Sequence, residues 1–401
     1  MKKFQLLSAA AVLTTFFVYA VQPGGQKPAQ MQVANAPEPN APPQKDNVIQ
    51  IALLLDVSSS MDGLIAQAKS ELWSVVSTIS AATKQGKAPM IQIAIYDYGK
   101  STHSPANNYV RRVLDFTSDL DVVSQKLFEL QTNGGEEYCG AVIANSVNEL
   151  QWLQDDDQYK TIIVAGNEPF NQGSVDYKQS CLKATQKYII VNTVHCGDNS
   201  TGITTYWQDG AQRGKGKYLS INSNIVAKHY TTPYDATLEQ LNAMLNNTYW
   251  GYGAQGRVAE KNVQVQDAGN YTENKAGYYQ RIAVKSKSRT YQDNTATWDV
   301  TSKAVSKDGT VIVSEVEKLK EDELPEQLKR KTVEERKIII QHNYAQRDSI
   351  NREIGRLVTL REQHIAEQKR LDNTRDGQQS LGSALVDAIK QQAIAKGYTF
   401  E

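Results

Sequence analysis

Three side chains that carry oxygen atoms stand at alternate positions directly after an apolar stretch, in IALLLDVSSSMDG (residues 51–63). Asp56, Ser58 and Ser60 can converge on one cation, and a carboxylate with two hydroxyl groups suits a hard ion such as Mg²⁺ or Mn²⁺. The same residue types also cap helix N-termini. An aspartate after an apolar strand can also act as a phosphotransfer nucleophile. That chemistry uses a second aspartate two residues later, where this chain has Ser58, so we favour the metal loop.

The elements that must position this loop alternate along residues 47–255. Apolar runs typical of strands buried on both faces are separated by segments with helical spacing of apolar residues; the runs are VIQIALLLD, MIQIAIYDYG, KTIIVAG and YIIVNTVHC. This alternation predicts an α/β fold, a doubly wound and mostly parallel sheet with helices on both faces. YVRRVLDF (residues 109–116) is expected to add an antiparallel strand at the edge. Asp56 then ends a central strand, where ligands bind in such sheets.

The Asp-x-Ser-x-Ser pattern at the end of this first strand resembles the metal-ion-dependent adhesion site (MIDAS) of the von Willebrand factor A (vWA) domain. The resemblance covers residues 47–255 and implies a doubly wound fold that binds a divalent cation, Mg²⁺ or Mn²⁺. It also implies a protein ligand, which completes the metal's coordination through an acidic residue.

The resemblance places two further ligands in two later loops. Where the family has a threonine after a Gly-Gly pair, this chain has Glu136 in TNGGEEYCGAV. Where the family has an aspartate after the fourth strand, this chain has IIVAGNEPF, which offers Asn167 or Glu168. The expected metal ligands are therefore Asp56, Ser58, Ser60, Glu136 and Asn167.

The N-terminus predicts export. Lys2 and Lys3 precede an apolar run, so residues 1–21 are a signal peptide or an uncleaved N-terminal anchor, the only membrane contact we expect. Residues 22–46 hold six of the eleven prolines and form a Pro/Gln/Ala-rich disordered linker. We expect a periplasmic or cell-envelope location. The 44 basic residues are balanced by 44 acidic ones, which argues against a nucleic-acid partner.

The C-terminal part divides into two segments of different character. Residues 256–312 are polar and weakly periodic and are expected to form an irregular arm or linker. Residues 313–401 are expected to be helical, with a capping box formed by Thr332 and Glu335. The long helix that follows has an interrupted apolar seam, so it forms a coiled coil, with homo-oligomers as a consequence, or packs on the last helix. AGNEPFNQG, VNTVHCGD and AIAKGYTFE resemble exported bacterial proteins that join a vWA domain to such a tail.

The three cysteines allow a disulfide or three buried thiols. In an oxidising compartment the pair to consider first is Cys181 with Cys196, and free buried thiols are equally consistent with the sequence. Cys139 with His195 could be drawn as a nucleophile and base, although nothing in the spacing brings them together.

Three functional hypotheses follow. The first is a non-enzymatic protein-binding or scaffolding module of the bacterial cell envelope that uses a vWA face with a degenerate MIDAS. The second is a structural assembly factor that acts through its helical tail and keeps a vestigial metal site. The third is a hydrolase that uses Asp56 or Cys139, which we place last.

Overall fold

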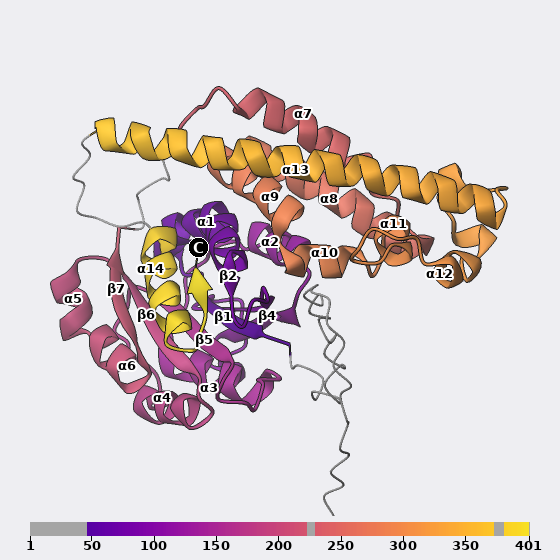
Figure 1. Ribbon diagram of the computed structural model, residues 1–401. Helices are drawn as coiled ribbons and strands as arrows, with labels where there is room; N and C mark the ends of the chain where they lie inside the picture. Colours follow the sequence, from indigo (N-terminus) through magenta and orange to yellow (C-terminus); the bar gives the residue numbers. More distant parts are fainter. Residues whose placement is uncertain (1–45, 223–228, 373–380, 401) are drawn as a thin grey trace, which may run out of the picture. The chain divides into compact units, whose positions relative to one another are not determined.

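A six-stranded sheet forms the centre of the protein, as a computed structural model shows for residues 46–222, 229–372 and 381–400 (Figure 1). The strand order is β4-β3-β1-β5-β6-β7. All neighbours are parallel except β3 and β4, so the predicted α/β sheet and its antiparallel edge strand are confirmed. The strands are β1 (Val48–Asp56), β3 (Met90–Tyr98), β4 (Val110–Thr117), β5 (Tyr159–Gly166), β6 (Ile190–Cys196) and β7 (Lys215–Ile221).

Helices cover both faces of this sheet because successive strand residues point to opposite sides. In β1, Ile49 and Ile51 belong to one apolar core together with α1 (Asp62–Ser80). Ala52 and Leu54 belong to a second core on the other face, with α3 (Cys139–Glu149). Burial on both faces explains why β1 reads as a nearly continuous apolar run.

The last helix of the chain returns to the sheet. α14 (Leu381–Ile394) packs on α1 and against β7, and β8 (Thr399–Phe400) pairs with β2 (Ala82–Thr83). Gln392 of α14 is buried and joins two strands: it accepts a hydrogen bond from the Tyr159 hydroxyl at 2.7 Å and donates one to Asn192 at 2.7 Å. The described chain from Asp46 onward therefore forms one compact unit.

The expectation of an irregular arm at residues 256–312 is wrong. This segment lies largely in helices: α8 (Gly253–Glu273), α9 (Lys275–Lys287), α10 (Arg289–Thr295) and α11 (Val300–Ala304). α9 packs along α1, and its Tyr278, Ile282 and Val284 join the apolar core that contains α1. The polar composition suggested an exposed, irregular segment. The buried polar residues here instead have hydrogen-bond partners in other segments, which the local sequence pattern does not reveal.

Four charged side chains form a buried ion-pair cluster at this contact. Arg281 of α9 bridges Asp121 of α2 (Leu120–Phe128) and Asp267 of α8, with 2.6 Å from its Nε to Asp267. Lys285 lies 2.8 Å from the other oxygen of Asp267. Although burial works against it, Lys285 and Arg281 hold the pKa of Asp267 well below its usual value. Two negative and two positive charges therefore balance inside the protein.

The long helix α13 (Val333–Asp372) begins after the predicted capping box, in which the Thr332 amide donates to Glu335 at 2.8 Å. Its main contacts are with α7 (Asp235–Asn246), α9 and α11 (Figure 1). Five residues of its apolar seam are thereby buried within the chain: Ile340, Ile350, Ile354, Leu357 and Val358. Within the described residues, the seam thus packs on other helices of the same chain.

The predicted signal peptide or anchor and the predicted linker, residues 1–21 and 22–46, lie outside the described residues except for Asp46. In the part of the chain that is described, no helix combines the length and the apolar character that a bilayer crossing requires.

Candidate functional site

The candidate site lies where the sheet changes strand order. β1 pairs with β3 on one side and with β5 on the other, so the segments that follow β1 leave from a topological switch point. Asp56 is the last residue of β1 and is fully buried there. The predicted position of Asp56 at the end of a central strand is confirmed.

Glycines make room for the Asp56 carboxylate. A Cβ on Gly99, which follows β3, would come within 2.9 Å of one carboxylate oxygen, and a Cβ on Gly166, which ends β5, would come within 3.0 Å of the other. Gly99 also has a φ of +81°, which a side chain would strain. These two close approaches create the space in which other oxygen atoms can reach Asp56.

The loop after β1 directs its serine hydroxyls toward each other. The Ser58 amide donates to Asp56 at 2.7 Å, the Ser58 and Ser60 hydroxyls are 3.1 Å apart, and the Ser60 hydroxyl donates to the Asn167 side chain at 3.3 Å. The short 3-10 turn Ser59–Met61 and the helix α1 that follows it begin without a side-chain cap. The serine hydroxyls therefore do not cap the helix. Four of the five predicted ligands come together: Asp56, Ser58, Ser60 and Asn167.

The glutamate at this site is Glu137 and not the predicted Glu136. Glu136 is exposed, and its carboxylate accepts a hydrogen bond from the Tyr138 hydroxyl at 3.5 Å. Glu137 is only 8% exposed, and its carboxyl lies within hydrogen-bonding reach of Asp56 and Ser58. The loop is held in place by the Asn133 amide, which donates to the carbonyl of Val57 at 2.9 Å. We call Asp56, Ser58, Ser60, Glu137 and Asn167 the strand-end site.

Burial raises the pKa of both carboxyl groups in the strand-end site, and the charge of Asp56 raises that of Glu137 further. Burial raises the pKa of Asp56 to about 6. Burial, followed by the nearby charge of Asp56, raises the pKa of Glu137 to about 9. Asp56 Oδ2 and Glu137 Oε2 are both buried without a hydrogen-bond partner. Without a cation, the pair therefore holds at least one proton at neutral pH.

The oxygen atoms of the strand-end site fit a divalent cation. Two carboxylates, two hydroxyls and one amide oxygen are the donor types that Mg²⁺ and Mn²⁺ prefer, and two unpartnered buried oxygens are available to bind one. Across the described segments, no group of three or more His, Cys, Asp or Glu side chains is placed to hold a metal. A cation here would therefore depend on the hydroxyl groups of Ser58 and Ser60 as well.

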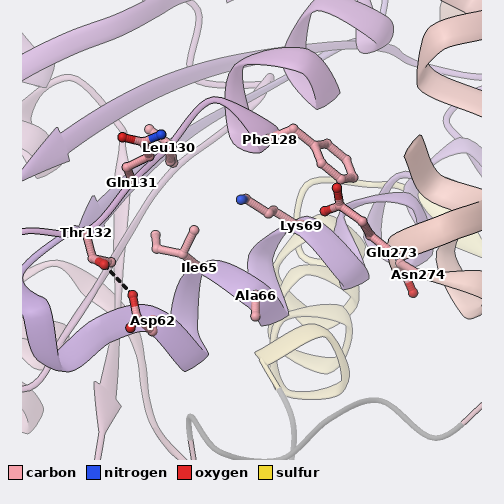
Figure 2. A pocket seen from close by; sticks show the side chains of 10 residues that line it. All are labelled: Asp62, Ile65, Ala66, Lys69, Phe128, Leu130, Gln131, Thr132, Glu273 and Asn274. Atoms are coloured by element: carbon pink, nitrogen blue, oxygen red, sulfur yellow. Dashed lines mark hydrogen bonds between the residues drawn. The ribbon is translucent and has the colours of Figure 1, made fainter. Parts of the chain in front are cut away.

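A hollow of about 530 Å³ adjoins this region between α1, the end of α2 and the junction of α8 with α9 (Figure 2). Asp62 at the start of α1 accepts a hydrogen bond from Thr132 of the loop that carries Glu137. Further along α1, the Lys69 side chain extends into the hollow, with Phe128 and Glu273 at the far end. The hollow therefore offers both charged and apolar contacts next to the strand-end site.

Cys139 and His195, the alternative candidate nucleophile and base, have other neighbours in the described structure. All three cysteines are buried free thiols, so the Cys181–Cys196 disulfide is not formed. The Cys139 thiol lies 3.5 Å from the Tyr98 hydroxyl, and burial raises its pKa well above the usual value. His195 instead packs against the ring of Trp207, at 5.7 Å between centroids. Cys139 is thus a buried neutral thiol, and within the described residues its side-chain hydrogen-bond partner is the Tyr98 hydroxyl and not a histidine.

Comparisons with known proteins find partial similarity to solved structures only. No family model matches the chain, and no curated protein matches it. Solved structures align with less than half of it. The conserved hypothetical protein BatB from Bacteroides thetaiotaomicron aligns with 43% of this chain and 90% of its own, at 15% identity and a TM-score of 0.33. The SpRpn10 VWA domain aligns with 43% of this chain and 88% of its own, at 15% identity and a TM-score of 0.33.

A third solved structure is the proximal thread matrix protein 1 from the mussel byssus, described with a zinc-occupied MIDAS motif. It aligns with 44% of this chain and 42% of its own, at 13% identity and a TM-score of 0.34. Similarity at this level carries no functional argument. The fold class rests on the strand order of this chain, and any function must be argued from its own site.

Proposed function

We propose that this protein is a non-enzymatic protein-binding module of the bacterial cell envelope, exported by its N-terminal segment. Its binding face is the edge of the sheet that carries the strand-end site, and a divalent cation, Mg²⁺ or Mn²⁺, occupies that site in the working protein. The observation that carries the proposal is the pair of buried carboxyls, Asp56 and Glu137, each with an oxygen atom that no hydrogen bond satisfies.

Burial of this pair is costly unless something positive lies between the two groups. An ionised carboxylate taken out of water loses several kcal/mol of solvation, on the order of magnitude known for buried ions, and a second one nearby adds repulsion. A bound cation would remove both costs and would satisfy the open oxygens. The cation supplies positive charge and open coordination positions, while the chain's own residues hold it at the surface of the sheet.

An enzymatic role has less support. Asp56 is 0% exposed and Cys139 is 2% exposed, so neither offers a nucleophile to a substrate. Assembly through the helical tail also has less support, because the apolar seam of α13 is buried against helices of the same chain. The strand-end face is therefore the better candidate for the working surface.

Isothermal titration calorimetry with Mg²⁺ and Mn²⁺ tests the cation and the identity of its ligands. We expect Glu137→Gln and Asp56→Asn to weaken cation binding by about tenfold or more, because each removes one charge from the ligand set. Glu136→Gln is the matched control, since this neighbouring residue is exposed and its carboxylate accepts a hydrogen bond from the Tyr138 hydroxyl. Equal binding by the parent, Glu137→Gln and Asp56→Asn proteins would contradict a cation at this site.

Recovery of partners from envelope extracts tests the binding function itself. A tagged protein should recover a partner in Mg²⁺ and lose it with Asp56→Asn. Recovery of the same partner by Asp56→Asn and the parent would contradict a role for the strand-end site. Recovery that depends only on residues 315–401 would favour the helical tail instead.

A further inference from the structure

The loops around the strand-end site carry a strong excess of negative charge. Residues 56–62, 99–102, 131–138 and 167–172 contain one cationic side chain, Lys100, and five carboxylates: Asp56, Asp62, Glu136, Glu137 and Glu168. A divalent cation would offset two of these charges and leave the face negative. A partner that approached with an acidic residue would therefore meet repulsion from the rim.

Only part of this charge is free for a partner. Asp62 is engaged by Thr132, and Asp56 and Glu137 lie inside the site. Glu136 and Glu168 are exposed on the rim, and the hydrogen bonds they accept come from neutral groups, the Tyr138 hydroxyl at 3.5 Å and the Gln172 amide at 3.3 Å. Glu168 also lies near enough to raise the pKa of both buried carboxyls by its charge. Within the described residues, neither Glu136 nor Glu168 forms an ion pair, so the rim keeps two uncompensated carboxylates.

Aromatic residues lie on the same segments as the rim carboxylates or next to them. Tyr138 contacts Glu136 through its hydroxyl and packs edge-on against Tyr109, with 6.0 Å between ring centroids. On the other side, the Phe170 amide donates to the Thr205 carbonyl at 2.9 Å and the Trp207 indole donates to the Glu168 carbonyl at 2.9 Å. The backbone at Tyr206 therefore adjoins the Glu168 loop, and the Tyr206 ring lies 6.4 Å from that of Tyr177 between centroids.

Tyr206 is held in an unusual position. It has a φ of +70°, a conformation that costs energy for a non-glycine residue, and it is 46% exposed. A carboxylate next to an exposed aromatic ring is a combination that attracts lysine and arginine side chains, through charge and through cation–π contact. The rim presents this combination in direct contact at Glu136 and Tyr138, and on neighbouring segments at Glu168 and Tyr206.

We propose that this rim, formed by Glu136, Tyr138, Glu168 and Tyr206, binds a basic segment of a protein partner through its lysine or arginine side chains. This inference rests on the proposed function, because it names the chemistry of the partner for the same face. It also replaces the acidic ligand that the sequence resemblance implied. Two carboxylates already match the charge of a divalent cation in the strand-end site, so the cation has little remaining charge to attract an acidic residue.

Fluorescence anisotropy with labelled nine-residue peptides tests the inference on the full-length protein. One peptide alternates lysine with serine and the other alternates glutamate with serine. Each is titrated at about 150 mM salt, where long-range attraction is screened, once with Mg²⁺ and once with a chelator. We expect the lysine peptide to bind about tenfold more tightly than the glutamate peptide under both conditions.

Two variant pairs locate the binding. Glu136→Gln/Glu168→Gln should weaken the lysine peptide by about fivefold, since each exposed charge pair contributes ~0.2–1 kcal/mol. The matched control Glu317→Gln/Glu362→Gln removes the same charge from exposed positions on other helices and should leave binding unchanged. Tyr206→Ala should also weaken binding, with the exposed Tyr271 changed to alanine as its control.

The outcomes separate this inference from the proposed function. Tighter binding of the glutamate peptide in Mg²⁺ would overturn the basic partner and would support the ligand type of the adhesion-site resemblance. Equal losses in the rim variant and the control variant would also overturn it, because the attraction would then be general. Loss of cation binding in Glu137→Gln, without any peptide selectivity, would leave the cation site standing and reject only the rim.

Discussion

Two pairs of buried carboxylates in this protein show what distinguishes a structural charge from a functional one. In the buried ion-pair cluster, Asp121 and Asp267 are met by Arg281 and Lys285, and each of their oxygens accepts a hydrogen bond. In the strand-end site, Asp56 and Glu137 face each other, and each keeps an oxygen without a partner. Burial alone is similar in the two places, and the difference lies in whether the chain supplies the opposite charge.

This contrast points to opposite consequences for stability. A balanced cluster fixes the contact between helices, and removing one member leaves a charge without compensation. An unbalanced pair is a cost within the folded protein that only a proton or an external cation can relieve. The protein therefore completes its own cluster but leaves the strand-end site to be completed by something outside the chain.

The largest expected effect is in the cluster. Arg281→Leu should lower the free energy of unfolding by ~3–5 kcal/mol, because Asp121 and Asp267 would stay buried with less positive charge. Urea denaturation of the parent and the variant measures this loss. In the double variant Arg281→Leu/Asp121→Leu, part of the stability should return, since one orphaned carboxylate is also removed. A loss below about 1 kcal/mol in the single variant would contradict this, because it would show that the cluster contributes no more than an exposed surface ion pair.

The next effect is a pH dependence that arises in the strand-end site. The pKa values of Asp56 and Glu137, about 6 and about 9, lie above the 3.8 and 4.5 expected for the unfolded chain. As the pH rises, the unfolded chain therefore loses these protons at a lower pH than the folded protein does. The free energy of unfolding is highest below about pH 4 and falls as the pH rises toward about 9. One pKa unit corresponds to ~1.4 kcal/mol, so we expect a loss of at least about 2 kcal/mol in a chelator.

Urea midpoints measured at several pH values in EDTA test this fall, and Glu137→Gln provides the comparison. The glutamine cannot ionise, so most of the loss at high pH should disappear in this variant. Adding Mg²⁺ to the parent should have a similar result, because a cation stabilises the ionised pair. A parent whose stability rises between about pH 5 and about pH 8 in EDTA would show that the two carboxyls are not coupled as described.

The smallest expected effect comes from the amide in the strand-end site. Asn167 accepts a hydrogen bond from Ser60 at 3.3 Å, and Asn167→Asp would add a third carboxylate to the ligand set. We expect cation affinity to rise by about tenfold in calorimetry, since affinity follows the charge of the ligands. Asn133→Asp adds the same charge in the exposed neighbouring loop and is the control. Equal gains in both variants would assign the effect to the acidic surface rather than to coordination.

The sequence was informative where short stretches decide the structure. The near-continuous apolar run of β1, the spacing of Asp56, Ser58 and Ser60, and the capping box before α13 depend on neighbouring residues only. The sequence was misleading at residues 256–312, where polar composition suggested an irregular arm. The segment is helical and packs on the rest of the protein, where Arg281 meets Asp121, 160 residues away along the chain, and shares Asp267 of the neighbouring helix with Lys285.

The candidate site shows the same division within a few residues. Two glutamates follow Gly134 and Gly135, and nothing in GGEE tells which of them turns inward. The conformation of that loop, held by Asn133 on Val57, buries Glu137 and exposes Glu136. The two adjacent glutamates after the glycine pair identified the loop. Which of the two faces Asp56 depends on the direction of the backbone, which the sequence does not reveal.

The sequence by itself determined the α/β class, the position of Asp56 at a strand end and the identity of the loops that approach it. The fold class and the position of Asp56 follow from local periodicity and from the rule that parallel strands end at one edge of a sheet. The loops were identified by the resemblance to the adhesion site of the vWA domain. The tertiary structure alone decided that Glu137 faces Asp56, that α9 is buried by ion pairs and that α14 returns to the sheet. The physical reason is that burial of polar groups is settled by partners, and those partners come from distant parts of the chain.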